Sequence, residues 1–346
     1  MSRRHPTLYF EDGDVVLSSD SADGVTTFYR IDKILLCRQS IIFREMFSLP
    51  MPEILGEMYD GVAWVRMPDP TEELERLLLA MYDVSTLPLK RRDPDTAILL
   101  SGAMKLAKKY EIESLRSLIL RHLEGDWPQD AELWCDFRHD IANAIDLHLN
   151  NPPQFRYAGQ YIDERFPEAA STLLFALDHN CPTLLRAASM LLIGRTSEWK
   201  SLQRDSRDMQ YERLASMRVI HFPAVRIHLL TDAHLAALKK GAEALSAELK
   251  KVANAELPVV SRAGCRSCSD NLVVWREVMG KKVAQMLLQG PDPISVVRKL
   301  YGGNNRPETV VCQPCWARDV KAVKDYRQKL WEDLPAIFGW YEQMSR

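Results

Sequence analysis

The chain has 346 residues, of which 46% are hydrophobic and 27% are charged, values ordinary for a folded protein large enough for two or three domains. Its 45 Lys and Arg residues are balanced by 47 Asp and Glu residues, which excludes the basic surface that nucleic-acid binding demands. No hydrophobic run has the length of a signal peptide or a membrane helix, so we expect an intracellular protein, cytoplasmic or nuclear, with no membrane or nucleic-acid partner.

The first third of the chain alternates between strand-like and helical patterns. Buried strands are predicted at residues 14–17, 25–31 and 62–68, the first two forming a hairpin across a polar turn. Helices are predicted at residues 32–38 and 40–48, from Thr71 onward, and over 97–123 with a break near Glu111. This part therefore contains both strands and helices.

The remainder shows almost no strand pattern up to residue 257. Helices are predicted over residues 130–149, over 167–194 as a pair, and over 233–257 as one amphipathic segment. A further helix is predicted from about residue 316 to 331. The sequence thus predicts an α+β chain in three parts, which are residues 8–126, a helical region at 130–257 and a small C-terminal module at 262–346.

The order of the elements in residues 8–126 resembles that of a BTB (POZ) domain. The resemblance rests on DVVL, on the strand-to-helix segment RIDKILLCRQSIIFREMF, on VAWVRMP, and on the helices LERLLLAMY and AMKLAKKYEIESLRSLILRHL. Within them, the pattern Ser40-x-x-Phe43-x-x-Met46-Phe47 and the A-x-K-Y run at 107–110 match two helices of the family. The chain departs from the family at Asp32, where a His is usual. With its helical middle and its C-terminal WEDLPAIFGW, it is similar to BTB proteins of basidiomycete fungi.

The resemblance implies a homodimer. In BTB dimers, the first helix and the strand before it pack against the same surface of a second copy, which is a two-fold arrangement. We predict that Phe28, Ile31, Leu35 and Leu36 form this surface. The alternative is that all four are core residues, because periodicity cannot show what a helix packs against. The 13 residues before Asp14 are a short arm for the strand exchange that strengthens some BTB dimers.

A second implication concerns Asp14 and Lys33. They match positions at which BTB domains of transcription factors place an opposite-charge pair beside a groove at the dimer interface. The resemblance thus implies a charged pocket at these two residues. The alternative is structural, since an Asp at the start of a strand and a Lys in the first turn of a helix are ordinary.

The seven cysteines fall into two groups. Three stand singly in apolar helical segments, where a free thiol acts as a small buried hydrophobe: Cys37, Cys135 and Cys181. The other four form two Cys-x-x-Cys pairs, Cys265 with Cys268 and Cys312 with Cys315, the form that tetrahedral zinc sites use. We predict that these four hold one structural zinc ion, with four unligated thiols or a redox site as the alternatives.

No nucleophile elbow, phosphate loop, dinucleotide-binding glycine motif or HExxH motif is present, so we expect no enzymatic activity. The first hypothesis is a protein-interaction module that homodimerises through the BTB domain and presents a surface to an unidentified protein partner. The second is a substrate adaptor of a cullin-3 ubiquitin ligase, a role of many BTB proteins with helical extensions. The third, a transcription regulator, is disfavoured by the near-neutral charge and the lack of a DNA-binding domain.

Overall fold

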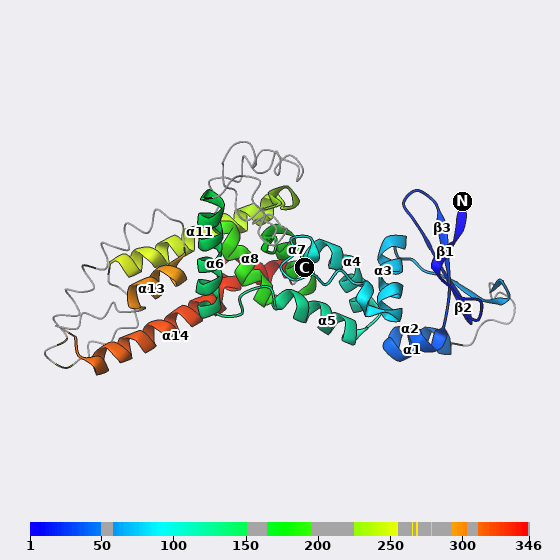
Figure 1. Cartoon of the computed structure of the whole chain (residues 1–346), viewed down its shortest axis with the longest axis horizontal. Helices are drawn as coiled ribbons and strands as arrows, with labels where there is room; N and C mark the ends of the chain where they lie inside the picture. The colour runs from blue at the N-terminus through cyan, green and yellow to red at the C-terminus, as the bar shows by residue number, and fades with distance from the viewer. Residues whose placement is uncertain are drawn as a thin grey trace. The chain divides into compact units, whose positions relative to one another are not determined.

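The computed structural model describes residues 1–49, 58–150, 165–194, 225–254, 292–302 and 311–344, together with Cys265, Cys268 and Val278. The chain divides into two compact units, Met1–Arg91 with Asp95–Leu123, and Arg92–Pro94 with Glu124–Arg346. It is a mixed α+β chain, in which a small N-terminal sheet of five strands is followed mostly by helices (Figure 1). The division into three parts stays a prediction.

The first unit contains the sheet, whose strand order is β1-β3-β2-β5-β4. The strands are β1 (Ser2–Tyr9), β2 (Val15–Asp20), β3 (Thr26–Ile31), β4 (Met58–Tyr59) and β5 (Val62–Arg66). Strands β2 and β3 form the predicted antiparallel hairpin, β5 lies parallel to β2, and β1 lies parallel to β3. The sequence prediction missed β1 and β4. In β1 only His5 and Leu8 are buried, three positions apart, so the strand lacks the alternation that would have revealed it.

The helices of the first unit are α1 (Lys33–Gln39), α2 (Ile41–Ser48), α3 (Thr71–Tyr82), α4 (Thr96–Lys109) and α5 (Glu113–Glu124), with a short 3-10 helix η1 (Val84–Thr86). All five α-helices were predicted. The break between α4 and α5 falls where expected, because Glu111 adopts a left-handed backbone with φ of 52°. Such a residue cannot continue a right-handed helix.

Ser40 joins two distant parts of this unit. Its hydroxyl oxygen accepts a hydrogen bond from the Phe43 N–H at 3.0 Å, which caps α2. The same hydroxyl donates to the carbonyl of Tyr110 at 2.6 Å, and the rings of Phe43 and Tyr110 stack with centroids 4.5 Å apart. The two short motifs that carry the family resemblance therefore meet in the core of the unit.

The second unit is built from the helices α6 (Ala131–Leu149), α7 (Ala169–His179), α8 (Pro182–Ile193), α11 (Asp232–Ala253), α13 (Pro293–Tyr301), α14 (Gln313–Ile337) and α15 (Trp340–Met344), with η4 (Ile227–Leu229). The predictions for α6, α7, α8 and α11 are confirmed. Helix α14 is longer than predicted, since it starts directly after Cys312 and continues through Pro335. In the described part of the chain, no helix is long and apolar enough to cross a membrane.

Buried tryptophans mark the core of the second unit. Trp331 on α14 is fully buried, with its ring 5.8 Å from that of Trp134 on α6, and its Nε1–H donates to the Gln129 carbonyl at 3.1 Å. Trp340 is also fully buried and donates to the Ser189 hydroxyl of α8 at 2.9 Å. Both rings therefore bury their apolar surface while their N–H groups stay hydrogen-bonded.

Gly241 lets α11 approach the end of α14 closely. A Cβ atom at this position would overlap the ring of Phe338. That ring is itself buried and stacks on Trp340 with centroids 6.0 Å apart, so it has no free space to move into. The glycine is therefore required by packing, although it weakens a helix interior.

Gly241→Ala should lower the stability of the second unit. Alanine favours a helix over glycine by about 1 kcal/mol, whereas overpacking a filled core costs about 1–3 kcal/mol. We expect a net loss of up to about 2 kcal/mol in the free energy of unfolding, measured by urea denaturation. Phe338→Leu removes the clashing ring. In that background, Gly241→Ala should therefore lower the free energy of unfolding by less. An equal cost in both backgrounds would contradict the packing explanation.

Candidate metal centre

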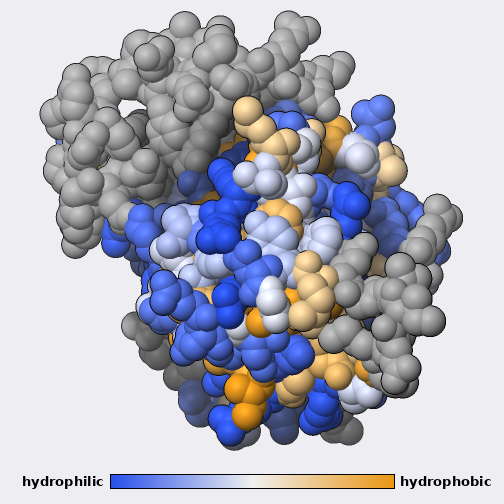
Figure 2. All heavy atoms as spheres, turned by 90° about the vertical axis from the view of Figure 1, so that its right-hand side faces the viewer, coloured by the Kyte–Doolittle hydropathy of each residue, from blue (hydrophilic) through white to orange (hydrophobic). Residues whose placement is uncertain are grey.

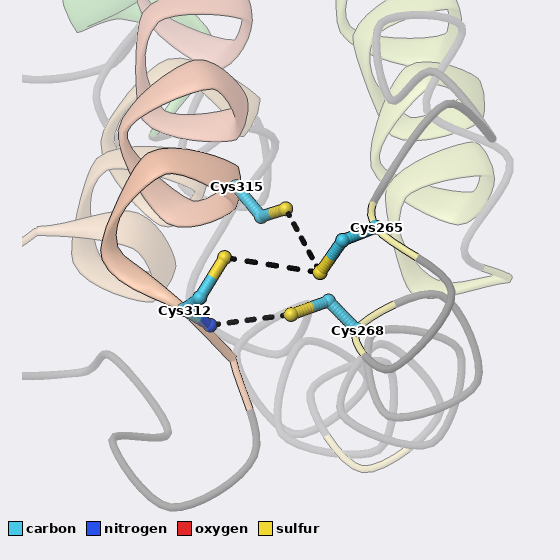
Figure 3. A group of neighbouring side chains, drawn as sticks. All are labelled: Cys265, Cys268, Cys312 and Cys315. Carbon is cyan, nitrogen blue, oxygen red and sulfur yellow. Dashed lines mark hydrogen bonds between the residues drawn. The ribbon is translucent and has the colours of Figure 1, made fainter.

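Four cysteine sulfurs lie together in the second unit (Figure 3). The Sγ atoms of Cys265, Cys268, Cys312 and Cys315 are all within 4.8 Å of one another. The Sγ of Cys265 is 3.9 Å from that of Cys312 and 3.9 Å from that of Cys315. A disulfide needs sulfurs about 2.05 Å apart, and none of the four cysteines forms one. The structure thus brings together both pairs that the sequence singled out.

The spacing of the sulfurs matches a tetrahedral metal–thiolate site. With metal–sulfur bonds of about 2.3 Å, two sulfurs of a regular tetrahedron lie about 3.8 Å apart. The two sulfur–sulfur distances of 3.9 Å from Cys265 agree with this value. The four cysteines can therefore hold a metal ion without a large rearrangement.

Local backbone structure positions each pair. In the first pair, the N–H of Cys268 donates to the carbonyl of Cys265 at 2.9 Å, which closes the turn that brings the two thiols together. In the second, Cys312 is the N-cap of α14 and Cys315 lies in its first turn, at the positive end of the helix dipole. The Cys312 N–H also donates to the Cys268 Sγ at 3.3 Å, so one pair supplies a hydrogen bond to a sulfur of the other.

Two of the thiols face the core and two face solvent. Cys268 and Cys315 are buried, whereas Cys265 and Cys312 are exposed. The buried pair belongs to a hydrophobic cluster built from α11, α13 and α14, in which Trp316 stacks on Tyr301 with centroids 5.6 Å apart. The group of four cysteines is therefore continuous with this cluster through Cys268 and Cys315.

The neighbouring thiols disfavour ionisation of Cys312 in the absence of a cation. The backbone N–H of Cys315, the largest single influence, lowers the pKa of Cys312. The thiols of Cys315, Cys268 and Cys265 and the loss of solvent together outweigh it and raise this pKa to about 11. Several thiolates can coexist at such short distances only if a positive ion balances their charge, which is what a bound metal provides.

The structure corrects most of the predicted dimer surface. Phe28, Ile31 and Leu36 are buried within the first unit, where the same chain covers them. Phe28 stacks on Tyr59 of β4 with centroids 4.2 Å apart. These three are core residues, and only Leu35 of the predicted set is half-buried.

Other apolar side chains near α1 and α2 are exposed instead. Ile34 is 62% exposed, Ile41 45% and Leu49 69%. Sequence reasoning missed them because Ile34, Leu35 and Leu36 form one apolar run, and the rotation of α1 decides which of them faces the core. That rotation is fixed by packing against α2 and α3, which the run itself does not encode.

Asp14 and Lys33 do not form an ion pair among the described contacts. The Asp14 carboxylate accepts a hydrogen bond from the backbone N–H of Lys33 at 2.7 Å, at the start of α1. The Lys33 Nζ lies over the ring of Phe47, 5.9 Å from its centroid. Asp14 therefore caps α1, since the Asp32 side chain at the N-cap makes no capping bond. This supports the structural alternative over the charged pocket.

Comparison of the chain with family models, with curated proteins and with solved structures finds no match. The BTB resemblance therefore stays an interpretation of the sequence, and function is argued from the fold and from the four cysteines.

Proposed function

We propose that this chain is a protein-interaction protein without enzymatic activity. In this proposal the first unit is BTB-like and associates with a second copy through α1 and α2. The second unit is stabilised by one zinc ion held by Cys265, Cys268, Cys312 and Cys315. The proposed interaction role rests on the exposure of three apolar side chains, Ile34, Ile41 and Leu49.

The exposed apolar groups of α1 and α2 support self-association. Figure 2 shows hydrophobic side chains among polar ones on the side of the molecule that carries the sheet and these two helices in Figure 1. Single exposed apolar residues are common on protein surfaces, but here three large ones fall within one short stretch of the chain. Ile34, Ile41 and Leu49 belong to α1, α2 and the residue that follows α2, and the half-buried Leu35 is next to Ile34.

The ligand set favours a structural zinc ion. Zinc takes four thiolates in a tetrahedron, and four protein ligands leave no open position for a substrate or an activated water. Cys-x-x-Cys pairs, sulfur distances of 3.9 Å and an N–H···S hydrogen bond between the pairs all fit this ion. Zinc would tie the segment at Cys265 to the start of α14.

Ile34→Asp should split the proposed dimer. Burial of a side chain of this size contributes about 1.5–3 kcal/mol, and a two-fold interface contains it twice. The loss of about 3 kcal/mol or more corresponds to dimerisation weakened about a hundredfold or more. Light scattering at a protein concentration of tens of micromolar, about the range suited to a micromolar dissociation constant, should show that the wild-type protein is a dimer and the variant a monomer.

Ile98→Asp is the matched control, because Ile98 on α4 of the same unit is 44% exposed. It should leave the dimer intact. A wild-type protein that is monomeric at these concentrations would overturn the self-association proposal. If both substitutions weaken dimerisation equally, the interface does not lie on α1.

Cys312→Ser should remove the zinc and loosen the hydrophobic cluster beside it. Elemental analysis should find about one zinc ion per wild-type chain. In the variant the metal should be lost, and protease cleavage near α13 and the start of α14 should become faster, because structural zinc contributes on the order of 10 kcal/mol of apparent binding free energy. Cys37→Ser is the control, since Cys37 lies in α1, in the other unit. Wild-type protein that binds no zinc, even after reduction and reconstitution, rules the site out.

Zinc affinity should rise with pH. Each thiol that binds the metal must lose its proton, and the pKa of Cys312 is about 11 in the metal-free cluster. Below that pKa the proton competes with the metal, so binding weakens as pH falls. The apparent affinity should increase about tenfold or more per pH unit near neutrality, measured by competition with a chromophoric chelator. An affinity that does not change with pH would argue against thiolate ligation.

A further inference from the structure

We propose that hydroperoxides oxidise Cys265 and Cys312. The two residues then form a disulfide that links the two Cys-x-x-Cys pairs, and the metal is released. The cross-link itself depends only on the positions of the four cysteines. The release of zinc rests on the function proposed above.

The exposure of the four sulfurs decides which react first. Cys265 and Cys312 are exposed to solvent, whereas Cys268 and Cys315 are buried in the cluster of α11, α13 and α14. A hydroperoxide must reach the sulfur it oxidises, and the susceptibility of a thiol follows its exposure and its thiolate character. Metal ligation supplies thiolate character to all four, so exposure selects Cys265 and Cys312.

The distances decide which sulfur resolves the first oxidation product. The Sγ of Cys265 lies 3.9 Å from those of Cys312 and Cys315, both in the other pair. Of these two, only Cys312 is exposed, whereas Cys315 is buried in the hydrophobic cluster. The Cys268 Sγ is buried and accepts the Cys312 N–H at 3.3 Å, which holds it in place. The geometry therefore favours a link between the pairs over one within a pair.

The reaction balances with a hydroperoxide as the only oxidant. The first sulfur attacks the terminal peroxide oxygen, the O–O bond breaks, and an alcohol leaves (water, in the case of hydrogen peroxide). The sulfur is then a sulfenic acid. The second thiol attacks that sulfur, forms the S–S bond and releases water. The two sulfurs lose two electrons, and the peroxide takes them up together with two protons. These protons come from the thiols in the metal-free protein, and from water where the sulfurs are zinc-bound thiolates.

The disulfide would replace the metal as the link between the segment at Cys265 and the start of α14. Cys265 and Cys312 are 47 residues apart in the chain, and their link ties the same two segments that the metal ties. The sulfurs need to approach from 3.9 Å to about 2.05 Å. With both thiols consumed, only Cys268 and Cys315 are left as ligands, too few to complete a four-thiolate site. Oxidation thus releases the ion while the start of α14 stays attached.

The test treats the zinc-loaded, full-length protein with hydrogen peroxide. Zinc release is followed with a chromophoric chelator, and the disulfide is located by mass spectrometry of non-reduced peptides. We expect release of the bound zinc together with a peptide pair joined through Cys265 and Cys312, both reversed by dithiothreitol and added zinc. Disulfides within the pairs, or four reduced thiols after treatment, would overturn the proposal.

Cys265→His provides a variant that keeps a zinc ligand at the position but cannot form the disulfide. Zinc loading should persist, and peroxide-driven release should slow at least about tenfold, because the exposed partner thiol is gone. Cys37→Ser should release zinc at the wild-type rate. If the purified protein holds no zinc, the zinc proposal fails, but the peptide map of the peroxide-treated, metal-free protein still decides whether Cys265 and Cys312 pair.

Discussion

The burial of one face of α14 holds the second unit together, because this 25-residue helix packs against α6, α8, α11 and α13. Its middle carries an unusual anchor, the buried guanidinium of Arg327. Nη2 of Arg327 donates to the carbonyl of Ala131 at 3.2 Å, to the carboxylate of Glu132 at 3.0 Å and to the Sγ of Cys135 at 3.3 Å. A buried charge is tolerated only when it is paired and hydrogen-bonded, so these bonds fix the position of α14 against α6.

The N-terminal end of α14 packs on a smaller core. The cluster there consists of apolar residues of α11, α13 and α14 together with Cys268 and Cys315. Small cores supply little stability on their own, and proteins commonly supplement them with a metal or a disulfide. The four cysteines stand where such a link is useful, since two of them belong to this cluster and the other two lie beside them. This position fits the structural role proposed for the metal.

The sequence predicted the elements that depend on local chemistry. A Cys-x-x-Cys turn brings two thiols together wherever it occurs, and the pattern of apolar residues revealed most helices. Two features depend on tertiary packing and could not be predicted from local patterns. One is the face of α1 that is buried, and the other is that Asp14 caps α1 instead of pairing with the Lys33 side chain. Helix α14 passes through Pro335 because packing of its last turn outweighs the missing N–H.

The missed strand β1 also limits how the first unit can associate with a copy of itself. It pairs in parallel with β3 of the same chain, from Ser2 opposite Thr26 to Arg4 opposite Phe28. Past that point Nδ1 of His5 accepts the N–H groups of Thr7 and Leu8, at 3.2 and 2.9 Å, so the irregular part of the strand is also hydrogen-bonded within the chain.

Strand β1 is an edge of the sheet, and Pro6 removes one donor from it. A strand of this kind is a poor template for a strand from another chain, because edge prolines interrupt the ladder of hydrogen bonds. On its inner side β1 pairs with β3, and on the strand as a whole Pro6 offers no N–H group. The self-association proposed for the first unit would then rely on side chains rather than on pairing through β1, and the exposed apolar residues of α1 and α2 are candidates for it.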